Sequence, residues 1–156
     1  MMTGTAERIF APEEVVTRGM FVTILYRLEK EPKHTEIKFS DVNSSDWYFD
    51  AVAWAKENGI TDGISDTEFG PNLKITREQM AVFMYRYAKY LKSVTDINAD
   101  IMSYEDYNDI SEYAVEAMRW AAENKIMSGK SAATLNPSDT ATRAETAAVV
   151  MRFING

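Results

Sequence analysis

The sequence contains an internal repeat, and this feature limits the possible fold more than any other. Each of three copies has a glycine, a proline eight residues later, and a Thr-Arg pair that begins five residues beyond the proline. Repeats at fixed spacing are supersecondary units that cannot bury their apolar faces alone. The sequence therefore predicts several small units that share one core. The glycines are Gly4, Gly63 and Gly129, and the arginines of the Thr-Arg pairs are Arg18, Arg77 and Arg143.

The copies differ in length, and this difference predicts the domain boundaries. Copies two and three also match upstream of their glycines at a constant offset of 66 residues, for example at Trp54 and Trp120, which we expect in the core. Copy one has no matching upstream part. We therefore expect a partial repeat at 1–34 that lacks its first helix, and whole repeats at 35–95 and 96–156. Because a natural domain seldom starts within a repeat, the chain is predicted to be a piece of a longer protein.

Each whole repeat is predicted to form two helices joined by a loop. Apolar residues recur at helical spacing over about 77–91, and a similar stripe follows the other two Thr-Arg pairs. Three like helices predict an all-α fold around a central three-helix bundle. The helix of copy one lacks its partner helix, so we expect its stripe to be exposed and to form a homodimer. That stripe consists of Phe21, Ile24, Leu25 and Leu28.

The Thr-Arg pair has two predicted roles. In copies two and three the threonine is followed three residues later by Gln79 and Glu145, which is the pattern of a helix capping box. Capping does not explain the arginine, because a cation in the first turn opposes the helix dipole. The arginine and the free N–H groups of the helix start can bind a carboxylate or phosphate, or the arginine can pair with a loop acid such as Asp66 or Asp139. Both interpretations stay open at this point.

A second arginine follows each Thr-Arg arginine after nine residues, as Arg86 follows Arg77. It falls in the last turns of the predicted helix, where a cation interacts favourably with the helix dipole. We therefore predict a structural role for it.

Composition excludes several classes of function. The chain has 17 Lys and Arg against 24 Asp and Glu, and this net charge of −7 argues against a nucleic-acid binder. It has no cysteine and one histidine, which excludes thiolate catalysis and Cys-based or multi-histidine metal sites. No stretch approaches the roughly 18 consecutive apolar residues of a membrane helix. We predict a binding module that is not an enzyme, has no cofactor or metal, and does not insert into a membrane.

The spaced residues of the whole repeats resemble the S-layer homology domain. The resemblance covers nearly the whole chain and rests on many positions. Copy three carries the family's most recognisable tetrapeptide, Thr-Arg-Ala-Glu, at 142–145. In copy two the matching segments are Phe39-Ser-Asp-Val42, Trp47-Tyr48, Ala51-Val-Ala-Trp54, Asn58-Gly-Ile60, Gly63, Phe69-Gly-Pro71 and Ile75-Thr-Arg-Glu-Gln-Met80.

The resemblance implies a fold, a function and a set of binding residues. Such helix–loop–helix domains come in threes, in a pseudo-threefold arrangement. They anchor surface-layer proteins and exoenzymes non-covalently to the wall of Gram-positive and related bacteria. The implied extracellular partner is an anionic secondary cell wall polysaccharide, often bearing pyruvate ketals, that is bound in grooves between repeats. The implied grooves combine Gly4 with Arg18 and Trp47, Gly63 with Arg77 and Tyr113, and Gly129 with Arg143.

Three other functions are consistent with parts of the sequence. Asp62 and Asp66 are spaced as a carboxylate pair that could serve a hydrolase, although copy three has no equivalent pair. Residues 41–45 resemble the start of a calcium-binding loop, but the required glycine and glutamate are missing. The main alternative is a protein–protein interaction or self-assembly module of a cell-surface protein.

Overall fold

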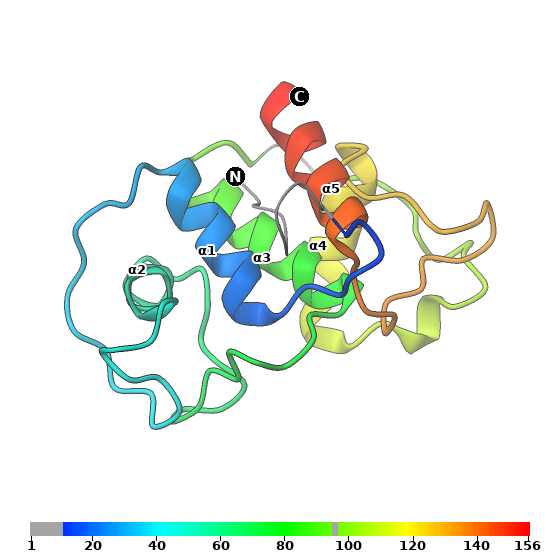
Figure 1. Cartoon of the computed structure of the whole chain (residues 1–156). Coiled ribbons are helices and arrows are strands. Elements are labelled where there is room, and N and C mark those ends of the chain that lie inside the picture. The colour runs from blue at the N-terminus through cyan, green and yellow to red at the C-terminus, as the bar shows by residue number, and fades with distance from the viewer. Residues whose placement is uncertain (1–10, 95–96) are drawn as a thin grey trace.

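The described residues, 11–94 and 97–156, form α-helices joined by long loops (Figure 1). The structure is a computed structural model. Within those residues there are isolated bridges between loop segments but no strand, so the all-α prediction is confirmed. No helix in this part of the chain is long and apolar enough to cross a membrane. The helices are α1 (Arg18–Leu28), α2 (Phe49–Glu57), α3 (Arg77–Tyr90), α4 (Val115–Glu123) and α5 (Arg143–Asn155), and the short 3₁₀ helices η1 (Tyr107–Asp109) and η2 (Glu112–Ala114) precede α4.

The helices α1, α3 and α5 each begin directly after the threonine of a Thr-Arg pair. The threonine hydroxyl accepts a hydrogen bond of 3.2 Å from the third amide of its helix in all three copies. The side chains of Gln79 and Glu145 accept a bond from the threonine amide in return, so both predicted capping boxes are complete. Each threonine cap contributes about 1 kcal/mol to helix stability.

The backbone segments that precede these three helices are joined in a closed ring of hydrogen bonds. Val16 N–H donates to Ala141 O at 2.9 Å, Ala141 N–H to Ile75 O at 3.0 Å, and Ile75 N–H to Val16 O at 2.9 Å. All three residues are fully buried. The ring therefore holds the first turns of α1, α3 and α5 close together, one from each copy. The pseudo-threefold arrangement of the repeats as a whole stays a prediction.

The first amides of these helices are bonded to a neighbouring copy. The N–H of Arg18 donates to Leu73 O at 2.9 Å, and the N–H of Gly19 donates to Pro71 O at 2.9 Å. Helix α3 makes equivalent bonds to copy three, and α5 makes them to copy one. The prediction that free helix amides help to bind an anion is therefore wrong. Any role in anion binding then falls to side chains rather than to these amides.

The Thr-Arg helices pack against the first helix of the following copy. Helix α1 contacts α2, and α3 contacts α4. Phe21, Ile24 and Leu25 are consequently buried. The prediction of an exposed stripe on the first helix is wrong because α2 covers it, and a homodimer through that face loses its basis. On α5, by contrast, the apolar side chains of Met151 and Ile154 are exposed.

Aromatic side chains of the first helices form much of the core. Trp54 and Trp120 are 0% and 2% exposed, as their matched positions predict. Phe153 of α5 lies 5.5 Å from Tyr87 and 6.2 Å from Trp120 between ring centroids. These contacts connect α5 to the helices of copies two and three.

Candidate functional site

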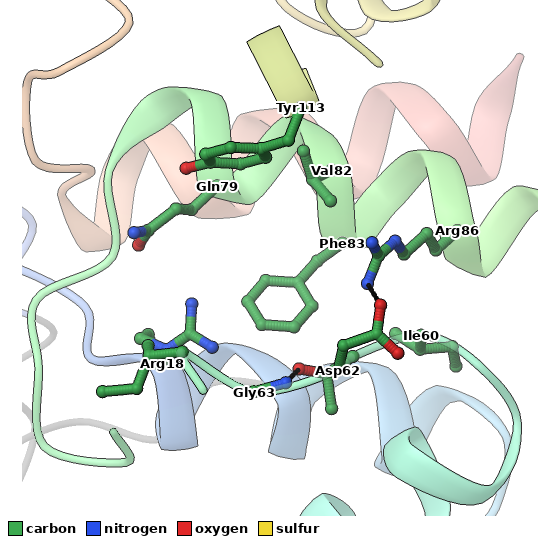
Figure 2. A pocket seen from close by; sticks show the side chains of 11 residues that line it. Arg18, Ile60, Asp62, Gly63, Gln79, Val82, Phe83, Arg86 and Tyr113 are labelled. Carbon is green, nitrogen blue, oxygen red and sulfur yellow. Dashed lines mark hydrogen bonds and ion pairs between the residues drawn. The ribbon is translucent and has the colours of Figure 1, made fainter. Parts of the chain in front are cut away.

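A groove of about 380 Å³ lies between residues from all three copies (Figure 2). Arg18 of α1 lies at one end, the loop 60–64 forms one wall, and α3 forms the opposite wall with Tyr113 of copy three. We call this cavity the Arg18 groove. Its volume is within the range of small-ligand sites. The α3 residues that line it are Gln79, Val82, Phe83 and Arg86.

Arg18 is a buried cation whose charge faces the groove. Its side chain is 5% exposed, and its Nε donates to Phe69 O at 3.0 Å. The guanidinium carbon lies 4.9 Å from the ring centroid of Phe69 and 5.1 Å from that of Phe83. Within 11–94 and 97–156, no carboxylate oxygen lies within 4.0 Å of its nitrogens, and Nη1 and Nη2 make no hydrogen bond. Such a guanidinium is suited to an incoming carboxylate.

Burial decides the charge properties of Arg18. Desolvation lowers its pKa to about 10, whereas the nearby Tyr113 and Asp41 act in the opposite direction. The side chain is therefore still positively charged at neutral pH. A buried cation that forms no ion pair is unfavourable, and an anionic ligand in contact with it would reduce that penalty.

Arg77 is held by the protein itself. Its Nε donates to Leu135 O at 3.1 Å, Nη2 donates to Ser128 O at 2.6 Å, and Nη1 pairs with Glu145 at 3.3 Å. All three nitrogens thus have partners in the loop around Gly129 or at the start of α5. Structural pairing, one of the two open interpretations, is correct for Arg77. The acid is Glu145, however, and neither of the acids named from the sequence.

The grouping of residues expected from the resemblance differs from the observed one. Gly63 lies with Arg18 and Tyr113, and Arg77 lies beside the Gly129 loop. The expected pairing of Gly63 with Arg77 is wrong because each helix start bonds to the loop of the next copy, which places the arginine there as well.

The other predicted binding residues lie elsewhere. Trp47 is 63% exposed, stacks edge-on against Tyr48 with centroids 5.0 Å apart, and does not line the Arg18 groove. Arg143 is buried, and its amide donates to Glu14 O. Gly4 lies outside the described residues. The expected combination of Gly4, Arg18 and Trp47 is therefore not found at Trp47 and falls outside the described residues at Gly4. The expected combination of Gly129 with Arg143 stays a prediction.

Glu78 holds Tyr113 in place by a hydrogen bond, and the sequence did not predict this role. The Glu78 carboxylate is buried and accepts hydrogen bonds from Ser111 N at 2.9 Å, Ser111 Oγ at 2.7 Å and Tyr113 Oη at 3.3 Å. Burial and Glu78 both raise the pKa of Tyr113, so the phenol stays protonated at neutral pH. The available signal was that copies one and three have the small residues Gly19 and Ala144 at this position.

Arg86 and Asp62 form an ion pair of 3.1 Å at the end of the groove opposite Arg18 (Figure 2). A structural role was predicted for Arg86, but its side chain also lines the groove. Asp62 also lies 4.0 Å from Lys56, whereas Asp66 is not part of the groove lining. The two carboxylates of the hydrolase interpretation therefore do not face one another across this site.

Asp41 has a structural role that the calcium-loop comparison did not anticipate. Its carboxylate accepts hydrogen bonds from Phe69 N at 2.9 Å and Gly70 N at 2.7 Å. Asp106 makes the equivalent bonds in copy three. Within the described ranges no group of three or more His, Asp or Glu side chains is placed to hold a metal ion.

Known proteins resemble the chain over almost its full length. The sequence model of the S-layer homology domain family matches residues 38–81 and 103–147. The chain is 32% identical over 155 residues to an endoglucanase of Bacillus sp. (strain KSM-635), which covers 99% of this chain and 16% of that protein. It is 30% identical over 159 residues to the surface-layer 125 kDa protein of Lysinibacillus sphaericus (99% and 13%). It is 24% identical over 154 residues to the cellulosome-anchoring protein of Acetivibrio thermocellus (94% and 33%). The chain thus spans a third or less of these relatives.

Proposed function

Because the chain belongs to the S-layer homology domain family, we propose that it anchors a larger protein to a bacterial cell wall by binding an anionic polysaccharide in the Arg18 groove. The observation that carries this proposal is the buried guanidinium of Arg18, which faces the groove without a carboxylate partner among the described residues. The ligand would be a secondary cell wall polymer outside a Gram-positive or related bacterium. Its anionic group would be a carboxylate, such as that of a pyruvate ketal on a sugar.

The chemistry of the groove supports a sugar acid better than a simple ion. The Arg18 guanidinium can donate two parallel hydrogen bonds to a carboxylate. The exposed ring of Tyr113 offers apolar surface to the C–H face of a pyranose, and the amide of Gln79 can bond to its hydroxyls. Gly63 allows the loop that forms one wall of the groove to pack tightly against the backbone of Ser65 and Glu68. We therefore assign Arg18, Gly63 and Tyr113 as the binding residues.

The net charge of the chain restricts how it can bind a polyanion. At −7 the protein repels a negatively charged polymer at long range. Recognition must then depend on short-range contacts inside the groove. A non-catalytic module of this kind would hold a larger protein at the cell surface, as the names of the cellulosome-anchoring and surface-layer relatives indicate for those proteins.

Sedimentation with purified cell-wall sacculi tests the proposal. We expect the intact chain to pellet with untreated sacculi and to remain in the supernatant after the secondary polymer has been removed with hydrofluoric acid. Equal pelleting with both preparations would contradict polysaccharide binding. Sacculi stripped of protein beforehand exclude the alternative that the chain attaches through another surface protein.

A further inference from the structure

The third residue of α3 and that of α5 each lie at a site that contains the arginine of the preceding copy. In α5 this residue is Glu145, which pairs with Arg77. In α3 it is Gln79, which lines the Arg18 groove together with Arg18 (Figure 2). The two positions are equivalent in the helix, because each closes a capping box. They differ in charge, and one acceptor oxygen of the glutamate is replaced by a donor nitrogen in the glutamine.

Glu145 uses its two oxygens for two tasks. One oxygen accepts from the amide of Thr142 at 2.9 Å and completes the helix cap. The other lies 3.3 Å from Nη1 of Arg77 and 3.7 Å from Nζ of Lys130. The carboxylate therefore neutralises the arginine, and Lys130 also pairs with Asp139 at 2.9 Å. The place beside Arg77 is already occupied by an anion that belongs to the protein.

Gln79 also completes its helix cap, but it carries no charge that could neutralise an arginine. Its Oε1 accepts from the amide of Thr76 at 3.3 Å, and its other polar atom is a neutral amide nitrogen. The partners of the Glu145 cluster are also replaced, since Ile64 and Leu73 stand where copy three has Lys130 and Asp139. Both of these apolar side chains are exposed. The ion cluster around Arg77 thus has a neutral and apolar counterpart around Arg18.

We propose that Gln79 determines which arginine binds the anionic ligand. Its amide is neutral and does not pair with Arg18, so the Arg18 guanidinium can pair with the ligand. Glu145 pairs with Arg77 and thereby prevents a ligand from doing so. The inference rests on the proposed function, and it adds that of these two arginines only Arg18 is available to the ligand. A carboxylate at position 79 would compete with the ligand for Arg18 from within the protein. Since glutamine and glutamate both serve at the third position of a capping box, the exchange does not remove the cap.

The variant Gln79→Glu tests this inference in the intact chain with purified sacculi as the probe. We expect its binding to fall by about tenfold or more, because a charge-assisted bond to the ligand is replaced by an internal one. Its urea midpoint should rise, because the buried cation gains a counter-charge. Unchanged binding, or a lower urea midpoint, would overturn the inference.

Glu145→Gln is the matched control. It makes the reverse exchange at the equivalent capping position, and we expect no loss of binding to sacculi. A loss equal to that of Gln79→Glu would contradict the inference, because it would show that the helix start is sensitive to either exchange. Failure of the unaltered chain to bind sacculi would instead reject the proposed function. The two failures are therefore distinguishable.

Discussion

Replacing Arg18 with glutamine should reduce binding to cell-wall sacculi by about tenfold to a hundredfold, which corresponds to the loss of one or two charge-assisted hydrogen bonds. The guanidinium is the cation that faces the groove without a carboxylate partner among the described residues. Its removal also relieves the desolvation of an uncompensated charge. We therefore expect the free energy of unfolding to stay close to that of the unaltered chain, which urea denaturation can measure.

Arg77→Gln is the control for this experiment and should show the opposite pattern. Arg77 donates to Leu135 O and Ser128 O and pairs with Glu145. Its loss leaves these acceptors unsatisfied, and we expect stability to fall by about 1–3 kcal/mol. Binding to sacculi should persist under conditions in which the variant is folded. If both variants lost binding equally, the distinction between the two arginines would be wrong.

Replacing Gly63 with alanine should destabilise the chain by about 2–4 kcal/mol and disrupt the groove wall. Gly63 has a φ of +90°, and an added Cβ would lie 2.5 Å from Glu68 O, 2.7 Å from Ser65 O and 2.8 Å from a ring carbon of Phe39. Two of these three neighbours are backbone atoms that cannot move aside easily. Urea denaturation and sacculus binding should both report the change.

Gly59→Ala separates the two causes of that effect. Gly59 also has a positive φ, of +70°, but a Cβ there would meet no atom within 4 Å. We expect a loss of only about 1–2 kcal/mol, which reflects backbone strain without a clash. Binding should be retained, since Gly59 does not line the groove. An equal loss of stability in the two variants would show that close packing around Gly63 is unimportant.

The helices and their caps could be predicted from the sequence because their causes are local. The apolar stripes, the Thr-Arg starts and the third-position residues lie within a few turns of one another, and local spacing determines them. Trp54 and Trp120 were placed in the core for a similar reason, as both fall on the apolar faces of equivalent helices. The family resemblance rests on the same spaced positions.

The partners of each repeat could not be predicted in this way. Hydrogen bonds such as that from Arg18 N–H to Leu73 O join residues more than fifty positions apart, and no local pattern states which loop a helix start will meet. Because each helix start bonds to the loop of another copy, Gly63 lies in one groove with Arg18 and not with the expected Arg77. Helix α2 also covers α1, which removed the exposed face on which the homodimer was predicted.

The net charge beside each arginine depends on single residues that differ between the copies, and the repeat pattern does not indicate which of these differences matter. Gln79 and Glu145 satisfy the same capping box, so capping alone does not distinguish them. Their different effect is visible only when the arginine of the preceding copy is placed beside them. Glu78 is similar, because its buried position and its bonds to Ser111 and Tyr113 depend on a loop of the next copy.

Titration of the intact chain with soluble wall polymer tests the central claim most directly. The polymer would be released from sacculi and compared before and after mild acid removal of its carboxylate-bearing ketals, with the affinity measured by calorimetry. We expect the untreated polymer to bind, and we expect removal of the carboxylates to weaken binding by about tenfold or more, because Arg18 then has no anion to bind. Equal affinity for the two polymers would contradict the central claim.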